Sequence, residues 1–395
     1  MDTVKFFAGT RPGRRIEAVV FASQSPQDNR VAWVDYAKGW SIILVVTMHS
    51  ALGVGFAVGR TGWLHELVAF AKPFRMPDFF LVAGLFAGRI IVQPWPRFID
   101  RKILHFAYFY ALWLFISLVV KSGEFDLRTP DAFLKAYLYG FVQPFSSMWF
   151  IHLLPILFLA TRLTKNWPAP LLLAVATIMH VMAARYPDGG VYAMSSIMTG
   201  WVTVDSFFLF FIYFLCGCLF TNNIFVFSAQ VARRPGVALI GFALWAVIEA
   251  AAVKMGLSEI PGATLGFGLA GAFAVVTLST LLAKAQLIRW LSYCGRNSLV
   301  IYLSFFLPMA ATRTLLVKTV LVSDVGLMSL IVAAVAIASP LVLDSLVMGT
   351  PLGFLFKRPV WARLERSSDT PRLTACKFDE ERDLPSEETI KTLGA

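Results

Sequence analysis

The sequence has few charged residues for its length. Of 395 residues, only 15% are Asp, Glu, Lys or Arg, whereas 57% are hydrophobic, and the mean hydropathy is +0.69. Soluble globular domains carry about 25% charged and about 45–50% apolar residues. A soluble enzyme of this length would therefore lack polar surface, and a disordered chain would be far less hydrophobic. The composition predicts a protein whose solvent is mostly lipid.

Cysteine is also scarce, and its spacing excludes two further classes of protein. The four cysteines form neither a disulfide framework nor a zinc-ligand pattern. Cys216 and Cys218 lie two positions apart in an apolar run, where a helix would point them in different directions, which favours packing. The sequence contains no Walker loop, no nucleophile elbow and no cluster of metal ligands, so we expect no bound metal.

Long apolar segments are abundant instead. We identify ten of them, each near the ~20 residues that a helix needs to cross the hydrocarbon core. They predict an all-α, polytopic integral membrane protein with about ten transmembrane helices. The second segment is expected to begin at Pro77, because Lys72, Pro73 and Arg75 interrupt the chain just before it. The segments are 39–58, 77–93, 103–121, 147–163, 168–184, 203–222, 237–255, 262–283, 297–316 and 326–349.

The net charge of +11 follows the predicted topology. With the N-terminus in the cytoplasm, 25 of the 35 Lys and Arg fall on the inner side and 10 on the outer side, as the positive-inside rule requires. The basic excess thus indicates membrane orientation rather than nucleic-acid binding. Both termini are predicted to be cytoplasmic, with a cytosolic segment at 1–37, a transmembrane domain at 38–350 and a flexible cytosolic tail at 351–395.

Ionisable residues at membrane depth are costly and are functional candidates by default. His49 lies well inside the first segment, eleven residues after Lys38. On a helix this spacing is about three turns, so both side chains share one face at a separation of about 16 Å. That arrangement suits a long bipolar ligand such as acyl-CoA, with Lys38 binding phosphate and His49 acting as a general base. The alternative is that His49 makes an interhelical hydrogen bond and that Lys38 extends to the headgroups.

Two carboxylates lie near this pair in sequence. Asp78 opens the second predicted segment, where it would either cap the helix or orient His49. Asp35 precedes Lys38 by three residues and is the second candidate for tuning the site. Gly84 and Gly88 form a small-xxx-small pair that predicts close helix packing.

Four motifs resemble the membrane-bound acyltransferase 3 family, and most closely its fucose 4-O-acetylase-like and glucan-succinylating branch. Together they extend over most of residues 30–310, in the order found in the family. They are Asp35-Tyr-Ala-Lys-Gly39 with the following His49, Met76-Pro-Asp-Phe-Phe-Leu-Val-Ala-Gly84, Ser147-Met-Trp-Phe-Ile-His152, and Gly295-Arg-Asn-Ser-Leu-Val-Ile-Tyr302.

The resemblance implies transfer of an acyl group, usually acetyl from acetyl-CoA, to a hydroxyl of a carbohydrate or another envelope molecule. It also implies a multi-pass protein of the bacterial cytoplasmic (inner) membrane. The family's basic–x10–His motif matches Lys38 and His49, and the family's histidine is held essential. Three positions depart from the family pattern: Arg75 and Ser304 stand where members often have histidine, and Ala83 where they usually have serine. The chain therefore lacks a histidine at the first two of these positions that could serve in catalysis or substrate binding.

The remaining candidates concern ligand binding. Arg89, Arg101 and Lys102 lie on the inner side beside Lys38, where they would bind the CoA phosphates or, alternatively, anionic lipid. The candidates for contacting the acceptor are Arg75, Trp149 and His152. A tryptophan at the start of a span is also typical of the membrane interface, so Trp149 admits that second interpretation.

The sequence thus favours an integral membrane O-acyltransferase that uses acyl-CoA as co-substrate and a carbohydrate or lipid-linked glycan as acceptor. It holds no permanently bound cofactor in this hypothesis and does not bind nucleic acid. One alternative is a transporter or flippase of an envelope glycan or small polar solute, in which His49, Arg75 and Glu249 form a polar path. Another is a non-catalytic membrane partner of a glycan-assembly complex.

Overall fold

The computed structural model describes residues 31–364 apart from 124–126, 128, 187–197 and 320. These residues are mainly helical and include no strand, which confirms the all-α class. The longer helices are α2 (Ala32–Val58), α3 (Trp63–Gly84), α6 (His105–Val120), α7 (Pro130–Gly140), α8 (Trp149–Leu163), α9 (Ala169–Ala184), α10 (Val202–Leu219), α11 (Thr221–Arg233), α12 (Pro235–Lys254), α13 (Ala263–Ala285), α16 (Phe306–Thr319) and α17 (Val325–Val347). The shorter ones are α4 (Ala87–Ile91), α5 (Trp95–Phe98), the π-helix η2 (Ile99–Leu104), η3 (Ser146–Met148), η4 (Leu257–Glu259), α14 (Arg289–Arg296), α15 (Ser298–Ser304), η5 (Pro351–Leu355) and η6 (Val360–Ala362).

When helix length and hydropathy are both required, the described part of the structure has fewer candidate membrane spans than the ten expected segments. Seven helical stretches among the described residues are long and apolar enough to cross a membrane, or eight if α15 and α16, which are bent by 53°, form one broken span. The two other expected segments fall on α9, a shorter apolar helix, and on α3. The chain is therefore a multi-pass membrane protein. Its orientation across the membrane stays a prediction.

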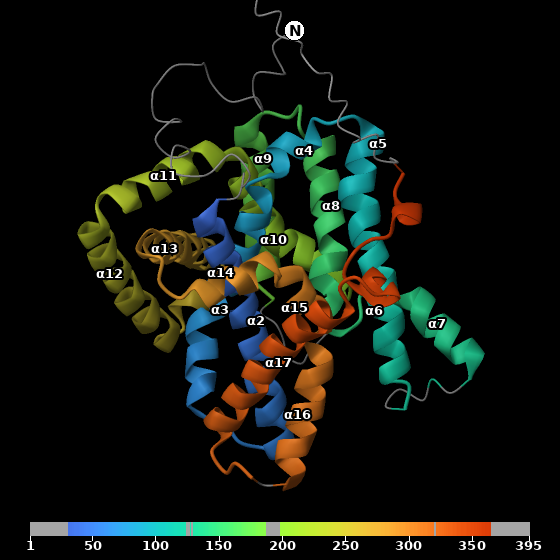
Figure 1. Ribbon diagram of the computed structural model, residues 1–395. Coiled ribbons are helices and arrows are strands. Elements are labelled where there is room, and N and C mark those ends of the chain that lie inside the picture. Colours follow the sequence, from blue (N-terminus) through green and yellow to red (C-terminus); the bar gives the residue numbers. More distant parts are fainter. Residues whose placement is uncertain (1–30, 124–126, 128, 187–197, 320, 365–395) are drawn as a thin grey trace, which may run out of the picture.

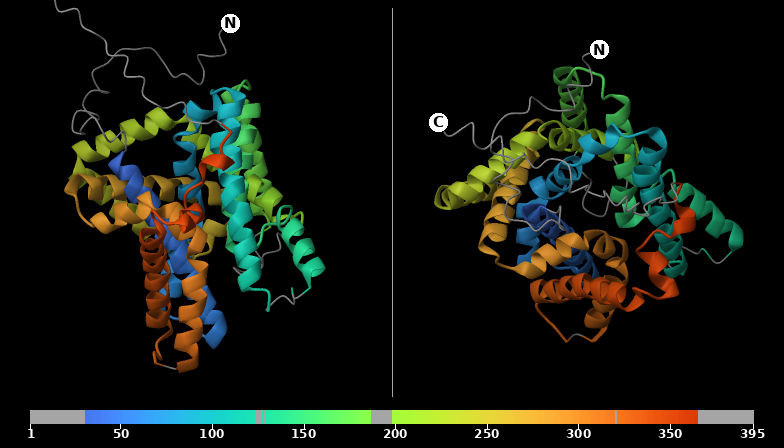
Figure 2. Two further views of the ribbon diagram at one scale, coloured as in Figure 1. Left: turned by 45° about the vertical axis from the view of Figure 1, so that its right-hand side comes forward. Right: turned by 45° about the horizontal axis from the view of Figure 1, so that its top comes forward.

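Helix α2 lies in the middle of the molecule, with α11, α12 and α13 on one side and α6 and α7 on the other (Figures 1 and 2). It packs against α3, α13, α14, α15, α16 and α17. Most of its 27 residues are buried, and its sequence is apolar on almost every face. A helix that is apolar on every face is stable at the centre of a bundle, where each face meets another helix. This position places Lys38 and His49 at the centre of the fold.

Helix α3 corrects the expected start of the second segment. The helix runs without a break from Trp63 to Gly84 and contains both Pro73 and Pro77. The prediction of an interruption at 72–77 was therefore wrong, as was the segment's continuation to residue 93, because α4 is a separate short helix. Proline is tolerated inside a membrane helix when neighbouring helices and local adjustments satisfy the freed backbone groups. Here α2, α10 and α13 pack along α3.

Two glycines allow α14 to approach the backbone of α2. A Cβ added at Gly39 would overlap the carbonyl of Leu291, and one added at Gly295 would overlap the carbonyl of Asp35. The first and last of the family-like motifs therefore pack on each other, backbone against backbone. Gly84 similarly meets the backbone of α10, which confirms its packing role, whereas Gly88 has only Cys218 Sγ nearby, at 3.9 Å.

We predict that Gly295→Ala destabilises the protein by about 1–3 kcal/mol, since the new methyl overlaps a carbonyl that cannot move aside without separating α2 from α14. Thermal unfolding of the detergent-solubilised protein measures this effect. The matched control is Gly266→Ala on α13, where the added Cβ meets open space. Both substitutions replace a helical glycine and gain the same helix propensity, so equal melting temperatures for the two variants would contradict the packing argument.

The ends of the transmembrane domain differ from the expected boundaries. Helix α2 begins at Ala32 and therefore extends into the segment 1–37, which was expected to be cytosolic. Residues 351–364, expected in a flexible tail, pack on α6 and η2: Tyr108 Oη donates to the carbonyl of Phe354 and Trp113 Nε1 to that of Leu355, both at 3.0 Å. Residues 1–30 and 365–395 lie outside the described part of the chain.

Candidate active site

Helix α2 carries both residues of the predicted pair. It is continuous from Ala32 to Val58, so Lys38 and His49 share one face about 16 Å apart along the axis. Both side chains are partly buried. On the same face between them, Ile42 and Val45 are buried, with 0% and 5% of their surface exposed. The stripe is thus polar at its two ends and apolar in the middle.

The surroundings of His49 combine one aromatic ring with two positive charges. The imidazole lies against the ring of Phe305, with a centroid separation of 5.4 Å. Phe305 lies at the bend between α15 and α16. The cationic groups that act electrostatically on His49 are Arg75 on α3 and Lys121 at the end of α6. The imidazole therefore contacts the α15–α16 bend and lies within electrostatic range of two cations, an arrangement that suits chemistry in which negative charge develops beside a base.

Asp78 occupies neither of the two expected positions. It lies in the interior of α3, so it is not a helix cap. Its carboxylate is buried and accepts a short hydrogen bond from the hydroxyl of Ser41 on α2. Ser41 lies eight residues before His49, about 12 Å closer to the Lys38 end. Asp78 therefore connects α3 to α2 at a point between Lys38 and His49. The structure shows no contact by which it would orient His49.

Asp35 is also distant from His49. Its carboxylate pairs with Arg296 on α14, with 3.4 Å between Oδ2 and Nε. It precedes His49 by fourteen residues, or about 21 Å along α2. The ion pair lies next to the close approach of Gly295 to the backbone of α2. The structure thus gives Asp35 a place in the α2–α14 contact, at the end of the helix that carries Lys38.

A group of basic residues lies at the Lys38 end. Lys38 and Arg101 are the cations that act electrostatically on Lys102. The ammonium of Lys102 lies over the ring of Phe158, 4.3 Å from its centroid. Arg89, on the short helix α4, is exposed. Lys38 and Arg101 are therefore near enough to Lys102 for their charges to act on it, whereas no described contact joins Arg89 to them.

Trp149 and His152 make packing contacts within the bundle. The ring of Trp149 stacks on Phe210 at a centroid distance of 5.6 Å. His152 Nε2 lies 3.0 Å from the carbonyl of Phe141, so this nitrogen must carry the hydrogen, and Nδ1 then accepts from the hydroxyl of Thr203 at 3.1 Å. Both ring nitrogens are engaged. These contacts favour a structural role for the two residues over direct contact with an acceptor.

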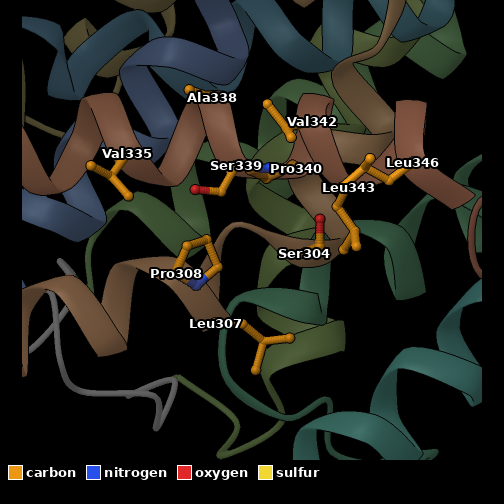
Figure 3. A pocket seen from close by; sticks show the side chains of 10 residues that line it. All are labelled: Ser304, Leu307, Pro308, Val335, Ala338, Ser339, Pro340, Val342, Leu343 and Leu346. Carbon is orange, nitrogen blue, oxygen red and sulfur yellow. The ribbon is translucent and has the colours of Figure 1, made fainter.

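A groove of about 490 Å³ opens beside the bend that carries Phe305. Figure 3 shows side chains of α15 and α16 facing those of α17 across it, with the hydroxyls of Ser304 and Ser339 as its polar groups. Ser304 is buried and donates to the carbonyl of Val300 at 3.0 Å. The groove is otherwise apolar, and neither Lys38 nor His49 lines it.

Several residues that matter in this geometry were missed by sequence reasoning. Ser41 stands in an apolar run and belongs to no motif, and only its spacing from Lys38 could have placed it near the stripe. Lys121 was counted as a charge at the end of a span, and nothing in the sequence indicates that it lies near His49. Within the described residues, no group of three or more His, Cys, Asp or Glu side chains could hold a metal ion.

Comparisons with known proteins agree with the motifs. The family described as "Acyltransferase domain" (acyltransferase 3) matches residues 31–344, which is most of the chain. Among curated proteins, the inner membrane protein YcfT of Escherichia coli (strain K12) is 24% identical over 226 residues, covering 51% of this chain. The match spans 59% of that relative's own length. No solved structure matches the chain. The family match confirms the resemblance drawn from the four motifs.

Proposed function

Because the chain belongs to the acyltransferase 3 family, we propose that it is an integral membrane O-acyltransferase. It moves an acyl group, most simply acetyl, from acyl-CoA to a hydroxyl of a cell-envelope carbohydrate or similar acceptor. The observation that carries this proposal is the placement of His49 and Lys38 on one face of a continuous, central helix, about 16 Å apart. A location in the bacterial inner membrane accords with the relative YcfT, which is an inner membrane protein.

The reaction assigns a role to each end of α2. Lys38, with Lys102 and Arg101, attracts the phosphates of acyl-CoA, and the pantetheine arm extends along the helix toward His49. The neutral imidazole takes the proton of the acceptor hydroxyl as its oxygen attacks the thioester carbonyl. The new C–O bond forms, the C–S bond breaks, and the proton leaves with the thiolate as CoA-SH. The positive charges of Arg75 and Lys121 stabilise the oxyanion formed during the attack.

The apolar middle of the stripe means that this mechanism requires a conformational change. Ile42 and Val45 are buried between Lys38 and His49. The pantetheine arm can reach the imidazole only if these side chains, or the helices that cover them, move when the donor binds. Such opening is common in enzymes that commit a substrate before reaction.

The proposal is tested with the purified protein, radiolabelled acetyl-CoA and isolated envelope glycan. Transfer of label to the glycan supports it. Absence of transfer to glycan together with absence of acetyl-CoA hydrolysis would contradict it. A transporter would instead move solute across sealed vesicles without CoA, so vesicle uptake measured without acyl-CoA separates the two classes of function.

We predict that Lys38→Ala raises the KM for acetyl-CoA about tenfold or more while changing kcat less. A charge-assisted contact to phosphate contributes about 1.5–3 kcal/mol, and 1.4 kcal/mol is tenfold in affinity. The matched control is Lys72→Ala on α3, which removes an exposed ion pair with Glu259 on η4. Initial rates at varied acetyl-CoA measure both constants. An unchanged KM in Lys38→Ala would exclude a role in donor binding.

A further inference from the structure

A polar cavity, separate from the groove beside Phe305, lies near the start of α2, which lines it with Ala32 and Tyr36. It has a volume of about 360 Å³ and lies between α2, α13 and α14. Its lining includes two guanidinium groups, one amide and two hydroxyls, with two alanines completing the wall. These residues are Ala32, Tyr36, Ala283, Gln286, Arg289, Ser292 and Arg296.

Helix α14 turns three different faces to its surroundings. Leu291 and Gly295 are buried against α2. Arg289, Ser292 and Arg296 follow one another at i, i+3 and i+7 and line the cavity. The charged face of the helix therefore lines the cavity, and both arginines are also exposed to solvent.

The third face of α14 is exposed and has the composition of a membrane interface. Trp290 is 60% exposed and Tyr293 51% exposed, and Leu287, just before the helix, is 57% exposed. Tryptophan and tyrosine concentrate where the hydrocarbon meets the headgroups. Exposed side chains of the kind that membrane interfaces favour therefore lie on the same short helix as the arginines of the cavity.

The polar groups of the cavity are held by contacts that leave donors for a ligand. Arg289 donates to the side-chain oxygen of Gln286 at 2.8 Å. Arg296 pairs with Asp35 at 3.4 Å and donates to the hydroxyl of Ser292 at 3.3 Å. A guanidinium has five N–H groups and binds phosphate oxygens in a bidentate manner, and these contacts occupy only part of that capacity.

We propose that this cavity binds a phosphate group, with Arg289 and Arg296 as its ligands. Two guanidinium groups against one carboxylate give the cavity a net positive charge, and basic pockets between membrane helices on the inner side bind anionic headgroups. The phosphate comes either from an anionic phospholipid or from a soluble phosphate monoester. The interfacial aromatic face of α14 favours the lipid. The site is separate from the Lys38–His49 stripe, and its existence does not depend on acyl transfer.

The test uses native mass spectrometry of the purified full-length chain with phosphatidylglycerol or phosphatidylcholine, and, separately, equilibrium binding of adenosine 3′,5′-bisphosphate. The variants are Arg289→Gln and Arg289→Gln/Arg296→Gln. The matched control is Arg233→Gln/Arg234→Gln, which removes two exposed arginines of α11 and its end that do not line the cavity. Thermal unfolding checks that each variant is folded. Arg289→Gln alone keeps the test valid if loss of the Arg296–Asp35 pair destabilises the double variant.

We expect the wild type to bind one phosphatidylglycerol about tenfold more tightly than the Arg289→Gln variant, with phosphatidylcholine binding weaker and equal in both. Loss of bisphosphate binding in the variant, with lipid binding unchanged, would support the same phosphate site with a soluble ligand. If neither ligand binds more weakly to the cavity variants than to the control variant, the proposal is overturned.

Discussion

Replacing His49 with glutamine is expected to lower kcat for acetyl transfer by about two to four orders of magnitude, the range that a general base contributes. Glutamine keeps the polarity and approximate volume of the side chain, and its amide nitrogen is not basic. The contact with Phe305 and the packing of α2 are therefore largely preserved. The KM for acetyl-CoA should change little, because the phosphates bind at the other end of the helix.

Transfer of label from acetyl-CoA at saturating donor measures this effect. The matched control is His180→Gln on α9. That imidazole is buried and hydrogen-bonds the carbonyl of Leu209 at 2.8 Å and the hydroxyl of Thr264 at 3.0 Å, which gives it a structural role. The control should lose stability but retain its turnover per folded molecule. A His49→Gln variant that turns over at the wild-type rate would exclude the imidazole as the base.

Replacing Arg358 with alanine is expected to destabilise the protein by about 3–5 kcal/mol, because it leaves a buried charge without its partner. Arg358 Nη2 lies 2.6 Å from Asp100 Oδ2, and both side chains are less than a tenth exposed. Arg358 also donates to the backbone carbonyl of Asp100 at 2.7 Å. The other carboxylate oxygen of Asp100 accepts from the backbone N–H of Leu364, also at 2.7 Å. These bonds attach residues 351–364 to the π-helix η2.

Thermal or denaturant unfolding in detergent measures this loss. Arg363→Ala is the matched control, since that exposed side chain makes only a 3.4 Å contact with the carbonyl of Arg358 among the bonds described. It should change stability by less than about 0.5 kcal/mol. Substituting both members of the pair with apolar residues, Asp100→Leu/Arg358→Met, should restore part of the stability, because no charge then remains buried. A single Arg358→Ala variant as stable as the wild type would show that the pair does not hold this segment.

Much of the helical architecture follows from the sequence for one physical reason. In lipid, backbone polar groups must be satisfied within the segment, so apolar stretches of sufficient length become helices. Each of the ten expected segments falls on a helix or helices of the structure. Proline positions are less informative: the segment with Pro73 and Pro77 predicts a boundary, yet α3 passes through both. Whether a proline ends a membrane helix depends on the helices packed beside it, which a single sequence does not reveal.

The sequence predicts the positions of site residues along α2, but it predicts contacts between different helices less well. The spacing of Lys38 and His49 is a property of one helix, so periodicity alone determines it. The partners of His49 come from α3, α6 and the α15–α16 bend, and of these only Arg75 was a candidate beforehand. The sequence offers two roles for Asp78, a helix cap or a group that orients His49, whereas the packing register of α3 on α2 places it beside Ser41. Register between helices is decided by contacts such as those of Gly39 and Gly295, which become visible only in the folded chain.

The most direct test of the account is equilibrium binding of acetyl-CoA to the detergent-solubilised protein by isothermal titration calorimetry, for the wild type, Lys38→Ala and His49→Gln. We predict saturable binding to the wild type, binding at least about tenfold weaker to Lys38→Ala, and near-normal binding to His49→Gln. Absence of binding to the folded wild type, or equal binding to all three proteins, would contradict a donor site that extends from the lysine to the imidazole.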